Sequence, residues 1–293
     1  MVHKVTYKAV DLVMGWFDRD FAQKVRWRIK YDRNPLFVIV QDKYRVREYA
    51  ATRGVKTAPL LYVTDKPETI PFDSLSGSYF IKANHGWGWN ILGKDDVLYL
   101  HGDGSQLFQE NNTINEEKRL TREACVALCQ DWLTQRYGRP RHLLSPVGTE
   151  WAYQEISPRI IVEKCLIARD GGELNDYRFY TFDGVVKAIN IGSRTYRREK
   201  LNVFFYPDWS EIKLTVYKDA VPDPLPPKPE NVTEMIQIAE RLGNGLDFIR
   251  VDMYDTTDGL VLGEMTVYPE RGARRTPTAC PKFNRWLGSQ WIR

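Results

Sequence analysis

Apolar residues recur three or four positions apart in four stretches of the chain, which is the spacing of one face of a helix. The pattern predicts helices over residues 8–30, 41–55, 116–137 and 231–243. The first predicted helix ends in a cluster of basic residues, which are Lys24, Arg26, Arg28 and Lys30. An amphipathic helix with a basic end either packs on the protein body or lies on a membrane surface, and both interpretations stay open here.

Runs rich in β-branched and aromatic residues predict strands between these helices. They cover residues 58–63, 79–82, 160–166, 174–182 and 185–191, with two more on either side of the sequence TTDG within 247–268. Asp183-Gly184 and TTDG are turn sequences, so each of the last two pairs of strands is expected to form a hairpin.

The register of the last hairpin decides which side chains share a face, because successive residues of a strand point to opposite faces. A three-residue loop over 257–259 would place Asp252 opposite Glu264 and Arg250 opposite Thr266. The other face would be apolar and part of the core, with Ile249, Val251, Met253, Val261, Met265 and Val267.

Two carboxylates in direct opposition repel each other unless a cation or a proton lies between them. Mg²⁺ usually takes one or two protein carboxylates together with phosphate oxygens, so Asp252 and Glu264 are candidate magnesium ligands. The alternative is a surface hairpin with a cross-strand cluster of Arg250, Asp252 and Glu264. A two-residue turn at Asp258-Gly259 would put the carboxylates on opposite faces and exclude the metal site.

A glycine-containing loop follows the strand that ends at Lys82, with the sequence ANHGWGWN over residues 83–90. Glycines allow backbone N–H groups to turn toward an anion, and Lys82 stands where strand and loop meet. The sequence is not a G-x-x-x-x-G-K-[ST] phosphate loop, so an ordinary hairpin turn is the alternative. His85 is expected to form hydrogen bonds within the loop rather than bind a metal, since no second ligand lies at metal-site spacing.

Charged residues inside otherwise apolar strands need a partner, because buried charges are paired or bound to a ligand. Glu163 and Lys164 are such residues in the strand over 160–166. The basic segment SRTYRREK (193–200) is either a solvated loop or a clamp for an anion, and the basic tail over 269–293 either closes over a ligand or packs.

Composition restricts the ligands that the protein could bind and the compartment in which it could act. A net charge of +4 is too small to indicate nucleic acid by itself and fits an anionic ligand equally well. The four cysteines form no C-x-x-C pair, and Cys125 and Cys129 lie four apart on a helical pattern, which suits buried thiols in a reducing cytoplasm. No signal peptide opens the chain and no apolar run is long enough to span a membrane.

Five motifs in this order resemble the ATP-grasp superfamily and, within it, the TupA-like branch, named for teichuronopeptide biosynthesis. The similarity covers nearly the whole chain. Its motifs are KVRWRIKYDRNPLF with QDKYRVREY, then FIKANHGWGWN, IVEKCL, DYRFYTFDGVVKAI and FIRVDMYDTTDGLVLGEMTVYPERG.

The resemblance implies an α+β fold, in which two lobes with antiparallel sheets grip ATP behind a small N-terminal preATP-grasp subdomain. We therefore expect a preATP-grasp subdomain over 1–75 and a lobe with the glycine-rich loop over 76–165. The lobe with the magnesium-binding hairpin would cover 166–293.

The resemblance also implies roles for single residues, position by position. Lys82 would reach the α- and β-phosphates, and Arg250 would meet the γ-phosphate. The loop over the triphosphate would include His85, Gly86 and Gly88, and the hinge strand beside adenine would include Glu163, Lys164 and Leu166. Asp176 and Arg178 would face the phosphates, and Asp252, Glu264 and Thr266 would hold Mg²⁺. Arg194 and Arg271 would bind the acidic substrate.

One position departs from the superfamily pattern. Many ATP-grasp enzymes have Glu-x-Asn where this chain has Glu264-Met265-Thr266, and a Thr hydroxyl is a weaker Mg²⁺ ligand than an Asn carbonyl. A second metal site is therefore in question, although the TupA-like branch itself tends to have Thr. Trp87 and Trp89 are bulky for a phosphate loop, and one of them could stack on the base or on an acceptor sugar.

The implied activity is an ATP-dependent carboxylate–amine ligase that forms an amide through an acyl phosphate. Its acceptor would be a uronic acid or polyglutamate in a cell-surface polymer, and its amine an amino acid. A glycan or small-molecule kinase is a second reading, which predicts ADP without free phosphate. A non-catalytic glycan- or nucleic-acid-binding protein is a third, which predicts binding that ignores Mg²⁺-ATP; no nucleic-acid partner is expected for the ligase.

Overall fold

The computed structural model describes residues 15–101, 114–138, 148–172, 174–192, 203–213, 225–273 and 280–292. Its α-helices are α2 (Phe21–Tyr31), α3 (Leu36–Gln41), α4 (Val46–Ala51), α5 (Arg122–Thr134), α6 (Trp151–Glu155), α7 (Val232–Gly243) and α8 (Pro281–Ser289). Short 3-10 turns cover Pro67–Thr69, Phe72–Ser74, Glu116–Lys118 and Pro269–Gly272.

The strands form two six-stranded sheets. One contains β1 (Lys56–Thr57), β12 (Gly259–Thr266), β11 (Phe248–Thr256), β8 (Asp176–Phe182), β9 (Val185–Gly192) and β10 (Phe204–Phe205), in this order across the sheet. The other contains β2 (Leu60–Thr64), β7 (Ile160–Lys164), β3 (Tyr79–Ala83), β4 (Asn90–Lys94), β5 (Val97–His101) and β6 (Arg119–Leu120). All described pairings are antiparallel except that of β1 with β12.

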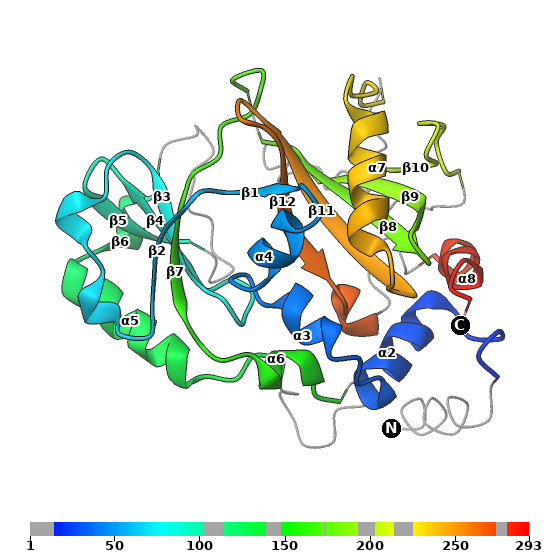
Figure 1. Ribbon diagram of the computed structural model, residues 1–293, viewed down its shortest axis with the longest axis horizontal. Coiled ribbons are helices and arrows are strands. Elements are labelled where there is room, and N and C mark those ends of the chain that lie inside the picture. The colour runs from blue at the N-terminus through cyan, green and yellow to red at the C-terminus, as the bar shows by residue number, and fades with distance from the viewer. Residues whose placement is uncertain are drawn as a thin grey trace.

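Each sheet has its own hydrophobic core. In Figure 1 the sheet that contains strands β8 to β12 (the β8–β12 sheet) lies under α7. The sheet that contains strands β2 to β7 (the β2–β7 sheet) lies beside α5. Apolar residues of α7, such as Met235 and Ala239, pack in one cluster with Ile249 and Val251 of β11. Cys125 and Cys129 of α5 are buried free thiols that pack with the other sheet. The face of β11 opposite Ile249 and Val251 is therefore left for polar side chains.

Two predicted helices differ from the observed ones at their ends. The helix over 8–30 begins only at Phe21 among the described residues, because Asp20 caps it with a side-chain bond to Gln23. The helix over 116–137 is α-helical only from Arg122, since a 3-10 turn and the short strand β6 come first. The helix over 41–55 is confirmed in its second half, and Gly54 ends it with a φ of +68°.

Two cations of α2 lie inside the protein rather than on its surface, which corrects the basis of the membrane interpretation. Lys24 donates to the carbonyls of Gly288 and Trp291, and Arg28 is 0% exposed. A membrane surface cannot attract charges that face the core, so the basic end of this helix does not form a polybasic patch. None of the described helices is long and apolar enough to cross a membrane.

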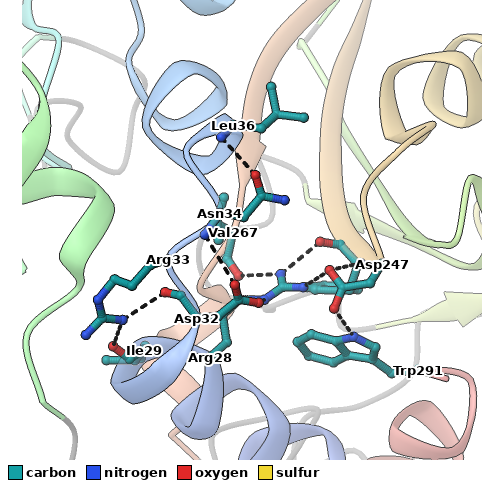
Figure 2. Close-up of polar contacts among 10 residues, drawn as sticks. Arg28, Ile29, Asp32, Arg33, Asn34, Leu36, Asp247, Val267 and Trp291 are labelled. Atoms are coloured by element: carbon teal, nitrogen blue, oxygen red, sulfur yellow. Dashed lines mark hydrogen bonds and ion pairs between the residues drawn. The ribbon is translucent and has the colours of Figure 1, made fainter. Parts of the chain in front are cut away.

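Arg28, near the start of the described residues, and Trp291, near their end, both bind the base of the β11–β12 hairpin. The guanidinium of Arg28 donates to the backbone carbonyl of Phe248 at 2.8 Å and forms an ion pair with Asp247. Figure 2 shows Trp291 next to Asp247, to which its indole N–H donates at 2.8 Å. A fully buried Arg is tolerated here because these acceptors replace its hydration.

The expected division at residues 75 and 165 follows the sheets only in part. Residue 165 separates β7 from β8, which belong to different sheets. The first segment contributes β1 to one sheet and β2 to the other, while α2, α3 and α4 share the core of the β8–β12 sheet. The three-part organisation stays a prediction.

Candidate active site

The β11–β12 hairpin has the predicted register but reaches it by a different route. Asp252 pairs with Glu264 and Arg250 pairs with Thr266, as expected. The three-residue loop was wrong, because Thr256 pairs with Gly259 across a two-residue turn.

A β-bulge restores the register that this shorter turn would have lost. Met253 pairs with Leu262 and Asp252 with Glu264, so Gly263 is an extra residue in β12. A Cβ atom on Gly263 would lie 2.4 Å from Cε2 of Tyr254, so only glycine fits at the bulge. Val261 pairs with Tyr254 and lies outside the large core cluster; Leu262 lies there instead, which corrects the predicted core face.

The polar face of this sheet brings predicted site residues from three strands together. Arg178 of β8 pairs with Asp252, which pairs with Glu264, so the three lie in one row across the sheet. Arg250 and Thr266 form part of the next row. Directly opposed side chains lie roughly 5 Å apart at Cβ, so these groups can act on one ligand.

Each carboxylate in this row is held by a cation. Arg250 donates two hydrogen bonds to Asp252, at 2.7 and 2.5 Å. Burial raises the pKa of Asp252 to about 6, although Arg250 opposes the shift. Arg178 pairs with Asp176 at 2.8 Å, and Gly192 leaves room for its guanidinium.

Lys43 joins the hairpin to the glycine loop. Its ammonium lies 3.3 Å from a Glu264 oxygen and donates to the carbonyl of Gly86 at 2.8 Å. Burial alone would raise the pKa of Glu264, but Lys43 and Arg250 together lower it below its usual value. The Glu264 carboxylate is therefore ionised and available as a cation ligand at neutral pH.

The donor set of this face fits a magnesium ion that shares its coordination with phosphate. Among the residues described above, no three His, Cys, Asp or Glu side chains gather as a complete metal site. Asp252 and Glu264 supply two hard oxygen ligands, and Mg²⁺ usually takes no more than that from the protein. Thr266 Oγ1 is buried without a hydrogen-bond partner, so it is a third oxygen that awaits one.

Glu163 is a buried carboxylate in β7, a strand of the other sheet. Its ion pairs explain why a charged residue lies in an otherwise apolar strand. It forms ion pairs with Lys82 of β3 and Arg47 of α4. Burial would raise the pKa of Glu163, but Lys82 and Arg47 lower it below its usual value. Glu163 thus holds two cations side by side at the edge of the cleft.

The glycine loop is fixed at its base and exposed at its tip. Gly86 lies against the ring of Trp89, where a Cβ would come within 2.4 Å, and Gly88 has a φ of +80°. Trp89 packs inward against His85 and Tyr137, whereas Trp87 is 65% exposed. Trp87 is therefore the tryptophan of this loop that a ligand can reach.

His85 lies inside the lobe, which corrects its expected contact with ATP. Its ring nitrogens lie 3.1 Å from Asn84 Oδ1 and 3.1 Å from the carbonyl of Trp132. Burial lowers the pKa of His85 to about 4, so the ring is neutral at physiological pH. The side chain positions the loop, as the hydrogen-bonding interpretation expected, and faces away from the cleft.

A pocket of about 590 Å³ lies where β7 ends and β1 and β12 pass. We call it the hinge pocket; its lining residues are Arg47, Ala51, Val55, Lys56, Thr57, Pro59, Lys164, Leu166, Asp258 and Val261. Lys164 and Leu166, both predicted from sequence, line one wall. A mostly apolar pocket with basic residues at its rim suits a flat ring attached to an anionic group.

The sequence profile of the TupA-like ATP-grasp family matches residues 23–292, which is most of the chain. This protein belongs to the TupA-like ATP-grasp family. No curated protein sequence matches the chain.

Several solved structures are similar to this TupA-like protein. It is similar to D-alanine–D-alanine ligase from Bacillus anthracis complexed with ATP, with 13% identity, a TM-score of 0.38, and coverage of 78% of this chain and 54% of that one. The ligase from Helicobacter pylori has 12% identity, a TM-score of 0.44, and coverage of 87% and 62%. N5-carboxyaminoimidazole synthetase from Staphylococcus aureus complexed with ADP has 9% identity, a TM-score of 0.45, and coverage of 93% and 58%. The chain thus spans less than two thirds of these proteins.

Sequence reasoning missed two cations of the TupA-like site, Lys43 and Arg47. Both lie in the motif QDKYRVREY, which was used for the predicted helix over 41–55 and for the resemblance, and they are four positions apart around the start of α4. That spacing on a short helix next to a loop was the available signal. Their partners Glu264 and Glu163 lie 221 and 116 residues further along the chain, beyond the reach of local patterns.

The two predicted substrate-binding arginines have different outcomes in the TupA-like protein. Arg271 donates to the carbonyls of Gly138 and Gly148, at 3.1 and 3.2 Å, so it joins the β12 end to the segment before α6. Arg194 lies outside the described residues, as does the whole basic segment 193–200.

Proposed function

We propose that this protein is an ATP-dependent carboxylate–amine ligase. The observation that carries the proposal is that the row of Arg178, Asp252 and Glu264 on one sheet lies near the Lys82–Glu163–Arg47 cluster of the other. Lys43, which contacts Glu264, also contributes to lowering the pKa of Glu163, so the two groups lie within electrostatic reach of each other. An anion such as a triphosphate, accompanied by a cation, complements both groups at once.

The hinge pocket would hold the adenine ring in this proposal. Lys82 and Arg47 stand next to it and would contact the phosphates, while Glu163 keeps both cations in place before ATP arrives. Ion pairs of this kind lower the cost of binding, because the cations are already ordered and partly desolvated. Gly86 and Gly88 would turn backbone N–H groups toward the phosphates.

The hairpin face would hold the reacting end of the nucleotide. Asp252, Glu264 and Thr266 would be the ligands of Mg²⁺, which when bound shields the charge of the phosphate oxygens. Arg250 and Arg178 would exchange their carboxylate partners for the γ-phosphate and the acceptor carboxylate. Phosphoryl transfer depends mainly on positioning and charge neutralisation, and these arginines supply both without a protein nucleophile.

The substrates and setting are proposed from the family resemblance. The acceptor would be an acidic sugar or polyglutamate in cell-surface polysaccharide biosynthesis, the amine an amino acid, and the location the cytoplasm. Arg194 stays a candidate for the acidic acceptor. Arg271 is already held by two carbonyls, so its role in this proposal is to order the far end of the cleft.

Thermal unfolding with and without Mg²⁺-ATP tests the nucleotide site. A ligand that binds only the folded state at 100 times its Kd stabilises the protein by about 2.7 kcal/mol, which raises Tm by several degrees. We expect this shift in the wild type and its loss in Glu264→Gln. Glu68→Gln, which removes an exposed carboxylate elsewhere, is the matched control. An equal shift in Glu264→Gln would contradict the assignment.

Phosphate release then separates a ligase from a kinase. A ligase releases ADP and free phosphate only when both a carboxylate and an amine are present. A kinase forms ADP and keeps the phosphoryl group on its product. Assays of both products with glucuronate, galacturonate and oligoglutamate as acceptors, each with and without amino acids, decide between them.

A further inference from the structure

A buried carboxylate with too few partners lies next to Arg271, beyond the end of β12. Glu150 precedes α6 and is 2% exposed. Its Oε2 atom is buried and has no hydrogen-bond partner among the residues that the structure describes. Arg271 is the nearest cation, at 3.7 Å, which is an ion-pair distance but too long for a hydrogen bond.

The surroundings of Glu150 are built to leave that oxygen free. The guanidinium of Arg271 is turned to the carbonyls of Gly138 and Gly148. A Cβ on Gly138 would lie 2.8 Å from Oε2, so the glycine lets the carboxylate lie close to the backbone. A buried carboxylate oxygen without a donor has lost its hydration with nothing in its place, so a ligand that donates to it would be favoured.

A pair of tyrosines connects Glu150 to the magnesium-binding face. The rings of Tyr137 and Tyr153 lie 4.8 Å apart, and the charges of both Glu150 and Glu264 act on each of them. Gln41 holds this pair to β12, because it donates to the hydroxyl of Tyr153 and accepts from the N–H of Val267 at 2.9 Å. Glu150 and Glu264 therefore flank the same two rings.

The order of the sites along β12 gives Glu150 a place in the reaction. The hinge pocket is lined at Asp258 and Val261, Glu264 lies further along the strand, and Glu150 lies next to Arg271 beyond its end. A nucleophile must approach the activated carboxyl from the side opposite the nucleotide. Substrate amines carry a proton at neutral pH and must lose it before they can attack.

We propose that Glu150 binds the ammonium group of the amine substrate and accepts its proton. This inference rests on the proposed ligase function and names the class of its second substrate, a primary ammonium compound. An ammonium ion has three N–H donors and no acceptor, which complements a buried carboxylate oxygen that has no donor. Tyr137 and Tyr153 would offer ring faces beside the cation.

The chemical step balances as follows. One proton passes from the ammonium nitrogen to Oε2 of Glu150, which leaves a lone pair on the neutral amine. That lone pair forms the C–N bond to the acyl carbon, and the C–O bond to phosphate breaks with its electrons on phosphate. The nitrogen loses a second proton to the released phosphate, and Glu150 returns its own proton to solvent.

Electrostatics agree with this geometry. Burial raises the pKa of Glu150 to about 7, and Arg271 only partly opposes it. The groups that face Glu150 are Arg271, Tyr137, Tyr153 and Tyr268, and the tyrosines are neutral at this pH because burial raises the pKa of each of them. A base whose pKa lies near the working pH is the most effective acceptor of a proton.

The test measures amine binding by thermal unfolding, with and without Mg²⁺ and a non-hydrolysable ATP analogue. The probes are the standard L-amino acids, glucosamine and putrescine, each at about 10 mM. The variants are Glu150→Gln and, as a matched control on the same short helix, Glu155→Gln, whose side chain is exposed. At least one amine should raise the Tm of the wild type and of Glu155→Gln but not of Glu150→Gln.

The pH dependence of the shift provides a readout that a merely structural role would not give. Ionised Glu150 attracts the ammonium, so affinity in the wild type should be about tenfold weaker at pH 6 than at pH 8. An equal amine shift in the wild type and Glu150→Gln, or no shift with any probe in the wild type, overturns the inference. Loss of the nucleotide shift with the amine shift intact instead overturns the ligase proposal and leaves the ammonium site standing.

Discussion

Glu163 and Glu150 are two buried glutamates with different environments. Glu163 is 9% exposed and lies between two cations, which lower its pKa. Glu150 is 2% exposed, has one arginine at 3.7 Å, and its pKa is raised to about 7. The residue type and the burial are alike, so the neighbours decide which carboxylate stays charged.

The difference indicates two uses of a buried acid. A carboxylate with two cationic partners is permanently ionised and serves to order those cations for phosphate. A carboxylate without a hydrogen-bond donor changes its charge near neutral pH and can exchange a proton with a ligand. In the proposed mechanism Glu163 positions cations because it has two cationic partners. Glu150 transfers a proton because it has no hydrogen-bond donor.

The largest effect should come from removing the charge of Glu163. Glu163→Gln leaves Lys82 and Arg47 side by side without a counter-charge, and breaking a buried pair in this way costs about 4 kcal/mol of the free energy of unfolding. ATP should recover much of the loss, because its phosphates replace the carboxylate. Chemical denaturation with and without ATP measures both effects, and a loss that ATP does not reduce would contradict the role of Glu163.

Gly263, at the bulge of β12, should be the next most sensitive position. Gly263→Ala drives a Cβ into the ring of Tyr254, and overpacking of this kind costs about 3 kcal/mol. The shift of β12 should also weaken the effect of Mg²⁺ on nucleotide binding. Adding Tyr254→Ala removes the obstacle and should restore the Mg²⁺ effect; persistence of the defect in the double variant would exclude the clash as its cause.

Lys43 connects the loop to the hairpin, and its removal should have a smaller effect. Lys43→Met loses charged hydrogen bonds worth about 2 kcal/mol in the free energy of unfolding. Burial would then raise the pKa of Glu264, because Lys43 is a main cause of its depression. Mg²⁺-dependent nucleotide binding, measured calorimetrically at pH 6 and pH 8, should weaken at the lower pH more in this variant than in the wild type, where of the Asp252 and Glu264 carboxylates only Asp252, with a pKa of about 6, gains a proton in this range. Identical pH dependence in variant and wild type would disprove this coupling.

The last effect is expected at Glu150, and unlike the others it is a gain in stability. The folded-state pKa of about 7 lies above the ordinary value of 4.5, so the native protein binds more protons between these pH values. Wild-type stability therefore falls as pH rises through this window, whereas Glu150→Gln carries no such penalty. The variant should match the wild type near pH 5 and exceed it by about 2.5 kcal/mol at pH 8. Denaturation curves at both pH values check this, and a variant that is less stable at pH 8 would refute it.

The fold and the centre of the site follow closely from local patterns. The alternation of Arg250, Asp252, Glu264 and Thr266 was enough to place them on one face, because a buried opposite face fixes the register. The turn was wrong because two different loop lengths fit TTDG, and the bulge that distinguishes them depends on contact between Gly263 and Tyr254. A lone glycine inside a strand was the available signal of a bulge.

The remainder depends on contacts that the sequence does not reveal. Lys24 and Arg28 seemed to belong to a basic surface, but they are buried against carbonyls contributed by β11 and the C-terminal segment. Arg47 and Lys43 gain their meaning only from glutamates far along the chain. Glu150 belongs to no motif, since its distinguishing property is the lack of a donor, which only the packed structure defines.

The Arg28–Asp247–Trp291 network affects when the protein can finish folding during translation. Ribosomes add about 5–20 residues per second, so Arg28 is made on the order of ten to fifty seconds before Trp291. Until Phe248 and Trp291 are made, the arginine lacks its β11 carbonyl and the indole that covers it, although Phe37 is already present. The packing of α2 on the hairpin that bears the proposed metal ligands is therefore complete only after translation has almost ended. Nascent chains of this protein should gain resistance to protease in one late step.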